Sequence, residues 1–263
     1  MSLAEEEPFH SFYRETPIRA IVGESKAIFY VHPGALIQGK SALTARVTGP
    51  WKTAGQDTLD WSDFDEETVD CALKFCYAQK YIVPWELDPS KEDPTPQEPA
   101  PSSAEHNAQS GSLKTRRSYA GEAVALHAKI YSFAHRYLVD DLQHYALGQM
   151  KDCLEPFLSD YRSSPSTSGV YLIDAIRVIY GTTPRLDSSV MDPARHALCD
   201  FVAASHEVFR FQFPDLHKGT GEFMVDLATK LSQFQPGKGV KETIHNPRVA
   251  AIATLRRNHR DLL

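Results

Sequence analysis

The chain of 263 residues is 42% hydrophobic and 10% aromatic, which is enough for a sizeable core in one domain or two. Its formal net charge of −6 argues against a general nucleic-acid binder, because such a protein needs a positive surface to meet phosphates. The four cysteines form no C-x-x-C pair and no apolar run approaches the roughly 18 residues of a membrane span, so we expect buried free thiols in an intracellular protein, cytoplasmic and/or nuclear, with no membrane contact.

The first predicted element is a β-hairpin, which follows an N-terminal lead over residues 1–17. The lead has no basic-then-apolar signal pattern. Two runs rich in β-branched and aromatic residues, IRAIV at 18–22 and AIFYV at 27–31, flank a four-residue turn that begins with Gly23. A turn this short joins antiparallel strands, because parallel strands need a crossover of a dozen residues or more.

The segment from Gly34 to Ser41, GALIQGKS, permits two interpretations. It matches the G-x-x-x-x-G-K-[ST] pattern of a phosphate-binding loop, which would make the protein nucleotide-binding. A phosphate cradle is made of backbone N–H groups on an exposed turn, so small and polar residues suit it. Leu36 and Ile37 would each lose roughly 1.5–3 kcal/mol of burial in such a loop, which argues against a phosphate site.

A buried helix explains the same segment better. Pro33 suits the first turn of a helix, and Leu36 and Ile37 are then expected to point inward. Leu43 and Val47 continue that side of the helix less regularly. Gly39 costs about 1 kcal/mol against alanine inside a helix, so we expect the helix to be short or interrupted there. A strand hairpin followed by a buried helix is the arrangement that we favour.

Stretches of helical periodicity lie on both sides of a linker. The first is expected to be capped by Asp63 or Asp65, and its apolar stripe comprises Val69, Ala72, Leu73, Cys76 and Tyr77. Residues 88–112 hold five prolines and no large apolar side chain, so we expect a disordered insertion at about 88–114. The stripe of the next helix comprises Val124, Ala128, Tyr131, Ala134 and Leu138. Asp140 then offers a new cap, with Gln143 placed for a capping box.

Four segments in this order resemble the BTB/POZ family of interaction domains, and in particular its fungal type. FYVH at 29–32 is similar to the strand and histidine that open the domain, and LDWSDFDEETV at 59–69 to the acidic loop before a helix. FCYAQKY at 75–81 resembles the tyrosine-centred end of that helix, and YSFAHRYLVDDL at 131–142 the helix pair that follows. The resemblance covers residues 18–155 and implies an α+β fold, with a small, mostly antiparallel sheet flanked by helices and an α-helical C-terminal extension.

The resemblance implies a non-enzymatic scaffold or adaptor for protein partners, with self-association as a further expectation. Family members that contact cullins often carry a phenylalanine-x-glutamate motif. The sequence WKT at 51–53 has no such acid, which argues against the alternative of a cullin-based ubiquitin-ligase adaptor. Trp51 is a candidate interaction residue, with burial in the core as an equal alternative. The short lead offers Phe9, Phe12 and Tyr13, because many family members dimerise by swapping an N-terminal helix.

The C-terminal part is expected to comprise a helical region over 169–234 and a basic tail over 235–263. Leu172, Ile176 and Ile179 recur at helical spacing, and Asp192 is expected to cap a further helix that Pro193 begins. We interpret the charges of the tail as solvated, with contact to an acidic partner as the alternative. They are Lys238, Lys241, Arg248, Arg256, Arg257 and Arg260.

The sequence presents no catalytic or metal-binding constellation. His127, His135 and His144 share a helical region, but angular offsets of about 80° and 180° at 100° per residue keep them off a common face. His32 lies at a strand end and is interpreted as a hydrogen-bonded structural residue. We therefore expect no enzyme activity, no catalytic residue, no metal and no cofactor, and we keep nucleotide binding by residues 34–41 as the alternative.

Overall fold

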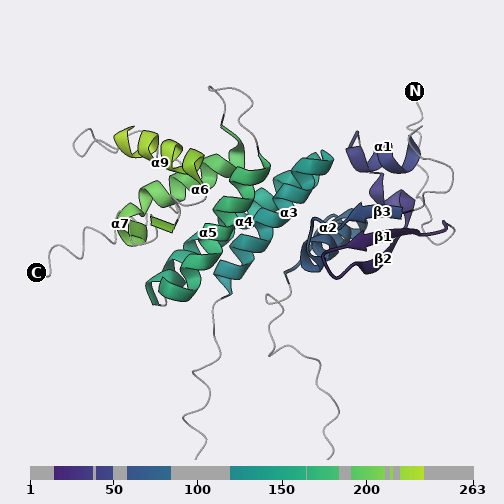
Figure 1. Ribbon diagram of the computed structural model, residues 1–263, viewed down its shortest axis with the longest axis horizontal. Helices are drawn as coiled ribbons and strands as arrows, with labels where there is room; N and C mark the ends of the chain where they lie inside the picture. The colour runs from purple at the N-terminus through teal and green to yellow at the C-terminus, as the bar shows by residue number, and fades with distance from the viewer. Residues whose placement is uncertain are drawn as a thin grey trace, which may run out of the picture.

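The computed structural model describes residues 15–37, 40–49, 58–83, 119–163, 165–183, 191–210, 214–215 and 220–233. A small three-stranded sheet near the N-terminus is followed by a mostly helical region, with eight α-helices in the described residues. This agrees with the expected α+β class. In Figure 1 the sheet and the first two helices form one end of an elongated molecule, and the later helices form the other.

The predicted hairpin is confirmed in both strands. β1 (Ile18–Val22) and β2 (Ala27–Val31) run antiparallel, with Ile18 opposite Val31 and Val22 opposite Ala27. The turn has positive φ angles at Gly23 (69°) and Lys26 (55°). Its Lys26 N–H donates to the carbonyl of Gly23 at 3.1 Å. Glycine adopts a positive φ without strain, which is the reason that this residue suits the first position of the turn.

The sheet is mixed rather than mostly antiparallel. β3 (Thr58–Trp61) pairs in parallel with β1, and the strand order is β2-β1-β3. The parallel pairing is a consequence of the crossover, because η2 (Pro33–Leu36) and α1 (Ala42–Thr48) return the chain to the far side of β1. One face of the sheet is buried through Ala20, Val22, Val31, Leu59 and Trp61.

The segment after β2 forms two separate elements rather than one continuous buried helix. η2 is a short 3-10 turn in which Leu36 is buried, and α1 is a separate helix capped by Ser41. Leu43 and Val47 are buried on α1, as predicted. Ile37 is 39% exposed, so its expected inward orientation is wrong. The reason is that the chain leaves the turn at Ile37 with φ −81° and ψ 85°, outside the helical region.

α2 (Glu66–Ala78) begins at one of the two caps that the sequence offers. The side chain of Asp65 accepts a hydrogen bond from the Thr68 N–H at 2.8 Å. The helix ends at Gln79, which has a φ of 55°. Tyr77 is 41% exposed and leaves the predicted apolar stripe, because its ring turns towards His32. The rest of the stripe is buried at Val69, Ala72, Leu73 and Cys76.

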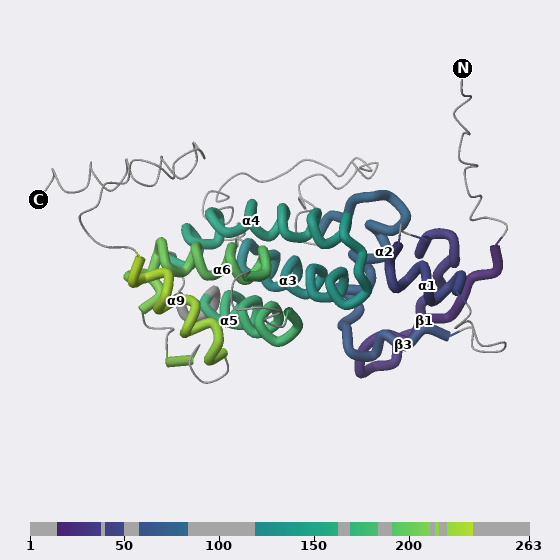
Figure 2. The backbone as a smooth tube through the Cα atoms, turned by 90° about the horizontal axis from the view of Figure 1, so that it is seen from above, coloured from purple at the N-terminus to yellow at the C-terminus, as the bar shows by residue number. Residues whose placement is uncertain are grey.

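α3 (Ala120–Tyr137), α4 (Asp140–Ser163) and α5 (Pro165–Thr182) pack side by side as the main helical bundle, as Figure 2 shows from above. Gly121 allows α3 and α5 to approach closely, because a Cβ at this position would lie 2.9 Å from the ring of Tyr171. The buried side chains of the bundle include Val124, Tyr131, Leu142, Met150 and Leu172.

The predicted capping box at the start of α4 does not form. Asp140 is the first residue of the helix, and the carbonyl of Val139 accepts the hydrogen bond from the Gln143 N–H at 2.9 Å. The side-chain amide of Gln143 donates instead to the hydroxyl of Tyr131 at 2.8 Å. A partner on α3 thus outcompetes the local contact that the sequence pattern suggests.

α6 (Pro193–Ala204), α7 (His206–Phe209) and α9 (Gly221–Gln233) complete the helical end. Asp192 caps α6 as predicted, accepting from the Ala194 N–H at 2.8 Å. α9 packs on α6 and buries Phe223 and Leu227. One hydrophobic core extends from the sheet to α9. Among the described helices, none is both long and apolar enough to cross a bilayer.

Three predicted segments lie outside the described residues. They are the insertion at about 88–114, the basic tail over 235–263, and the lead up to residue 14. The described part therefore consists of the sheet with its helices on one side of the insertion and the helical bundle on the other.

Candidate functional site

His32 and Tyr77 join the end of β2 to the end of α2. The Tyr77 hydroxyl accepts a hydrogen bond from the His32 backbone N–H at 3.0 Å and lies 2.9 Å from His32 Nδ1. The two rings meet edge to face, with centroids 6.0 Å apart. The hydroxyl thus holds the strand end against the helix, which gives His32 a structural role.

Two ion pairs hold the acidic loop before α2 against α3. Lys129 Nζ lies 2.7 Å from Asp65 Oδ2, and Arg136 Nη1 lies 2.6 Å from Asp63 Oδ2. Burial acts to raise the pKa of Asp65, but hydrogen bonds from Lys129 and Thr68 outweigh it and leave the pKa below its ordinary value. Because both pairs are well exposed, each contributes at most about 1 kcal/mol and serves mainly to fix the position of the loop.

Four aromatic rings from the same loop and from α3 pack together beside these ion pairs. The ring of Phe133 lies 5.5 Å from that of Trp61, 5.0 Å from that of Phe64 and 4.8 Å from that of Tyr137, measured between centroids. The Arg136 guanidinium lies 5.4 Å from the centroid of Phe64, within the range of a cation–π contact. The acidic loop and the helix after the insertion therefore share one aromatic cluster.

The phosphate-loop-like segment has its first donor occupied. The N–H of Gly34 donates to the Glu15 carboxylate at 2.7 Å, so this donor is already occupied. Ser41 is buried, and its Oγ accepts from the Thr44 N–H at 3.1 Å as the cap of α1. The preceding strand β2 lies antiparallel at an edge of the sheet, unlike the parallel strands of dinucleotide-binding folds. Residues 38–39 lie outside the described part.

The second face of the sheet is open. Tyr30 is 69% exposed and Ile28 is 48% exposed, and both lie on this face of β2. Across the hairpin, Tyr30 pairs with Arg19 and Ile28 pairs with Ile21. On β3 the face carries polar residues, with Asp60 exposed. Apolar side chains therefore gather at the β2 side of the face, which is also an edge of the sheet.

A buried arginine joins α5, α6 and α9 at the other end of the molecule. Arg195 is 2% exposed, and its guanidinium donates to the Thr183 hydroxyl at 2.9 Å, to the carbonyls of Tyr180 and Thr183, and to Glu222 at 2.6 Å. It also lies 4.3 Å from the centroid of the Tyr180 ring. The Tyr180 hydroxyl donates to the buried Asp226 at 3.1 Å, and burial together with this charge raises the pKa of Tyr180. These hydrogen bonds and the ion pair with Glu222 hold α9 against α5 and α6.

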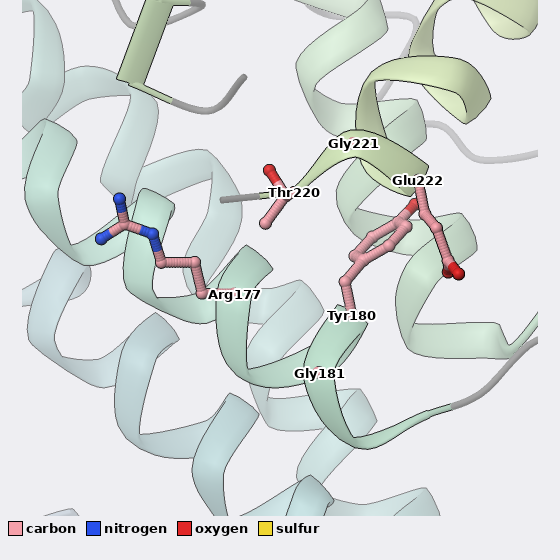
Figure 3. A pocket seen from close by; sticks show the side chains of 6 residues that line it. All are labelled: Arg177, Tyr180, Gly181, Thr220, Gly221 and Glu222. Carbon is pink, nitrogen blue, oxygen red and sulfur yellow. The ribbon is translucent and has the colours of Figure 1, made fainter. Parts of the chain in front are cut away.

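A small pocket lies beside this network, between the end of α5 and the start of α9 (Figure 3). Its volume of about 140 Å³ is below the roughly 300–1,000 Å³ of sites for drug-sized ligands. In Figure 3 the Arg177 side chain extends away from Tyr180. Its guanidinium lies 3.6 Å from Asp174 of the same helix. The lining residues are Arg177, Tyr180, Gly181, Thr220, Gly221 and Glu222. These polar groups do not converge on a common point.

His127 is a buried histidine in the interior of α3. Its side chain is 1% exposed, its Nδ1 lies 2.8 Å from the Tyr81 hydroxyl, and its Nε2 has no hydrogen-bond partner among the described residues. Burial lowers the pKa of His127 to about 4, so the ring is neutral at pH 7. In the described ranges, no group of three or more His, Cys, Asp or Glu residues is arranged to hold a metal ion.

None of the four cysteines, all of which lie in the described residues, is in a disulfide. Cys71, Cys76 and Cys199 are buried, and Cys153 is half-buried. Burial raises the pKa of Cys71 to about 11 and that of Cys76 and Cys199 to about 12. The thiolate is the reactive form of cysteine, so these three side chains are inert packing residues.

The four residues that the sequence marks for protein interaction, Phe9, Phe12, Tyr13 and Trp51, all lie outside the described part of the chain. The sequence did not single out Arg195, Asp226 or the exposed pair on β2. No family model, curated protein or solved structure matches this chain.

Proposed function

We propose that this protein is a non-enzymatic protein-interaction module, with a BTB/POZ-type scaffold and a helical C-terminal extension. The observation that carries the proposal is that the four segments resembling this family contact one another in pairs. His32 of the first segment bonds to Tyr77 of the third, and the acidic loop shares an aromatic cluster with α3. These contacts support a single folded unit built from the four segments.

Exposed apolar side chains give this scaffold surfaces that a partner could cover. Ile28 and Tyr30 adjoin on the open sheet face, and Leu138 is 60% exposed at the end of α3. Single exposed apolar residues are ordinary, whereas neighbouring ones on an open face favour an interaction site. The sheet face is therefore the first surface to test.

Affinity capture of the full chain from its native cell, followed by quantitative mass spectrometry, tests the proposal. Wild type is compared with Tyr30→Lys and Leu138→Lys, and Val225→Lys on α9 is the control with the same new charge at a 57% exposed position. We expect at least one protein that both wild type and Val225→Lys enrich. Tyr30→Lys or Leu138→Lys should no longer capture that protein. If no captured protein depends on either residue, these surfaces are not the interaction site.

Nucleotide binding by residues 34–41 is the alternative, and a thermal unfolding measurement separates it from the proposal. Because the Gly34 N–H already binds Glu15, we expect no change in the unfolding midpoint with Mg-ATP or Mg-GTP. A nucleotide-dependent rise in the midpoint of wild type that is absent in Lys40→Ala would instead assign the protein to the nucleotide-binding class.

The cullin-adaptor alternative is tested by titration calorimetry with a cullin N-terminal domain. The sequence at 51–53 lacks the expected acid and places a lysine there, and a reversed charge at an interface costs several kcal/mol. We expect weak or no binding by wild type, and the comparison variant is Thr53→Glu. Tight binding by wild type would move the assignment to a ubiquitin-ligase adaptor.

A further inference from the structure

The β2 edge of the sheet carries no charge. The strand reads AIFYV, and its two outward side chains, Ile28 and Tyr30, are among the exposed large apolar residues of the described chain. Natural proteins usually protect an edge strand with charged residues or proline, because its unpaired N–H and C=O groups are a template for another strand. In Figure 1, β2 lies on the opposite side of β1 from β3 and is the lowest of the three strands.

The opposite edge of the same sheet is protected. β3 carries the exposed Asp60, and hydrogen bonds from the Ser62 hydroxyl and N–H lower the pKa of this carboxyl, so it remains charged. Asp63 follows in the adjoining loop. Two copies that met through β3 would bring these carboxylates together. This contrast in charge between the two edges favours β2, rather than β3, as the edge that another strand would join.

The β2 strand is complementary to itself. If two copies pair antiparallel about a twofold axis at Phe29, Ile28 of each copy lies opposite Tyr30 of the other on the open face. Phe29 then faces its own counterpart on the buried face, where it already packs partly against the core. Aromatic and β-branched residues are favourable cross-strand neighbours, and no pair in this register brings like charges together.

Charge also favours this surface for a second copy. The whole chain has a net charge of −6, so two copies repel each other over most of their surfaces. β2 contains no charged residue of either sign, so antiparallel pairing through it opposes no like charges within the strand. The β2 edge therefore allows two copies to approach with less electrostatic opposition than the Asp60 edge does.

We propose that β2 pairs antiparallel with β2 of a second copy of this chain, about a twofold axis at Phe29, and joins two sheets into one of six strands. This inference goes beyond the proposed interaction function and does not depend on which other protein the module binds. Five-residue strands and two exposed side chains per copy bury less than the roughly 1,200–2,000 Å² of a stable interface. The dimer is accordingly reversible and depends on protein concentration.

Sedimentation equilibrium of the full chain tests the pairing. From about 1 to 500 µM, we expect the weight-average mass to rise from 29.4 kDa towards twice that value. Ile28→Lys and Tyr30→Lys should each raise the dimer dissociation constant about tenfold or more, because each substitution removes two cross-strand pairs per dimer. Val225→Lys on α9 adds the same charge and should leave the dissociation constant unchanged.

Disulfide cross-linking checks the register. In an equimolar mixture of Ile28→Cys and Tyr30→Cys under mild oxidation, the mixed dimer should form in excess over both like dimers, because opposed residues of antiparallel strands have Cα atoms about 4.5–5.5 Å apart, within the range that a disulfide spans. Wild type gives the background from the native thiols. An excess of like dimers would overturn the proposed register.

Three results would overturn the pairing itself. One is a monomer at every concentration, and another is self-association that neither Ile28→Lys nor Tyr30→Lys weakens. The third is a monomer that captures a different protein through these same residues. That last result would support the proposed interaction function and refute the pairing between two copies. The failure of one proposal can therefore be distinguished from the failure of the other.

Discussion

Acidification from pH 7.5 to pH 5 should destabilise the protein through His127. The unfolded chain binds a proton at this histidine near its ordinary pKa of 6.5, whereas the folded chain does not until about pH 4, because the ring is buried. Between these two values the unfolded state holds more protons than the folded state. The contribution of the neutral His127 to the free energy of unfolding is therefore fully present above about pH 6.5, and it is lost as the pH falls towards 4.

The size of the effect follows from the difference between the two pKa values. One pKa unit corresponds to about 1.4 kcal/mol, so lowering the pKa from 6.5 to about 4 amounts to roughly 3 kcal/mol in the fully acidic limit. About 2 kcal/mol of this is lost by pH 5. That is a substantial share of the roughly 5–15 kcal/mol by which a domain is usually stable.

Urea unfolding of wild type and of His127→Leu at pH 7.5, 6 and 5 isolates this contribution. The other titratable groups are common to both proteins, so the difference between their pH dependences belongs to His127. We expect the variant to lose about 2 kcal/mol less than wild type between pH 7.5 and pH 5. At pH 7.5 the substitution has two opposing polar effects, because it removes the unbonded Nε2 and also the hydrogen bond between Nδ1 and the Tyr81 hydroxyl. Equal pH dependences would refute the reasoning.

Two further predictions concern packing and the buried arginine. Gly121→Ala should be less stable than Gly148→Ala by about 1–3 kcal/mol in chemical denaturation, because the first added methyl meets Tyr171 at 2.9 Å and the second meets nothing within 4 Å. Equal stabilities would show that α5 shifts to accommodate the methyl. Arg195→Met should cost roughly 2–4 kcal/mol, because buried carbonyls of α5 lose their donor. Arg177→Met, which changes an exposed side chain, should stay within about 0.5 kcal/mol, and a similar loss in both variants would contradict a special role for the buried site.

Local signals predicted the parts of the fold that depend on neighbouring residues. The hairpin followed from a short glycine turn between two β-rich runs, and the start of α6 followed from Asp192 before a proline. The sequence pattern was wrong at Ile37 and at Gln143, where the backbone conformation and a tyrosine on α3 decide the outcome. Such contacts between distant residues leave no periodic trace in the sequence.

The candidate site was harder to predict for the same reason. The alternation in β2 indicates that Ile28 and Tyr30 share a face, but only the arrangement of the strands shows that this face is open and that β2 is an edge. Arg195 reads as a surface residue in a helical pattern, whereas its partners come from α5 and α9. The predicted interaction residues of the lead and at position 51 lie outside the described part, so their role stays a prediction.

Tyr81 connects the part of the chain before residue 84 to two helices that follow residue 118. Its hydroxyl bonds to His127 on α3, and its ring lies 5.1 Å from that of Tyr145 on α4. These contacts join the described chain before residue 84 to the helices after residue 118. The linker that the sequence predicts between them could then change in length at a cost of only about 0.6 kcal/mol per doubling. A reporter domain inserted in that predicted linker should therefore leave the contact between Tyr81 and His127 in place.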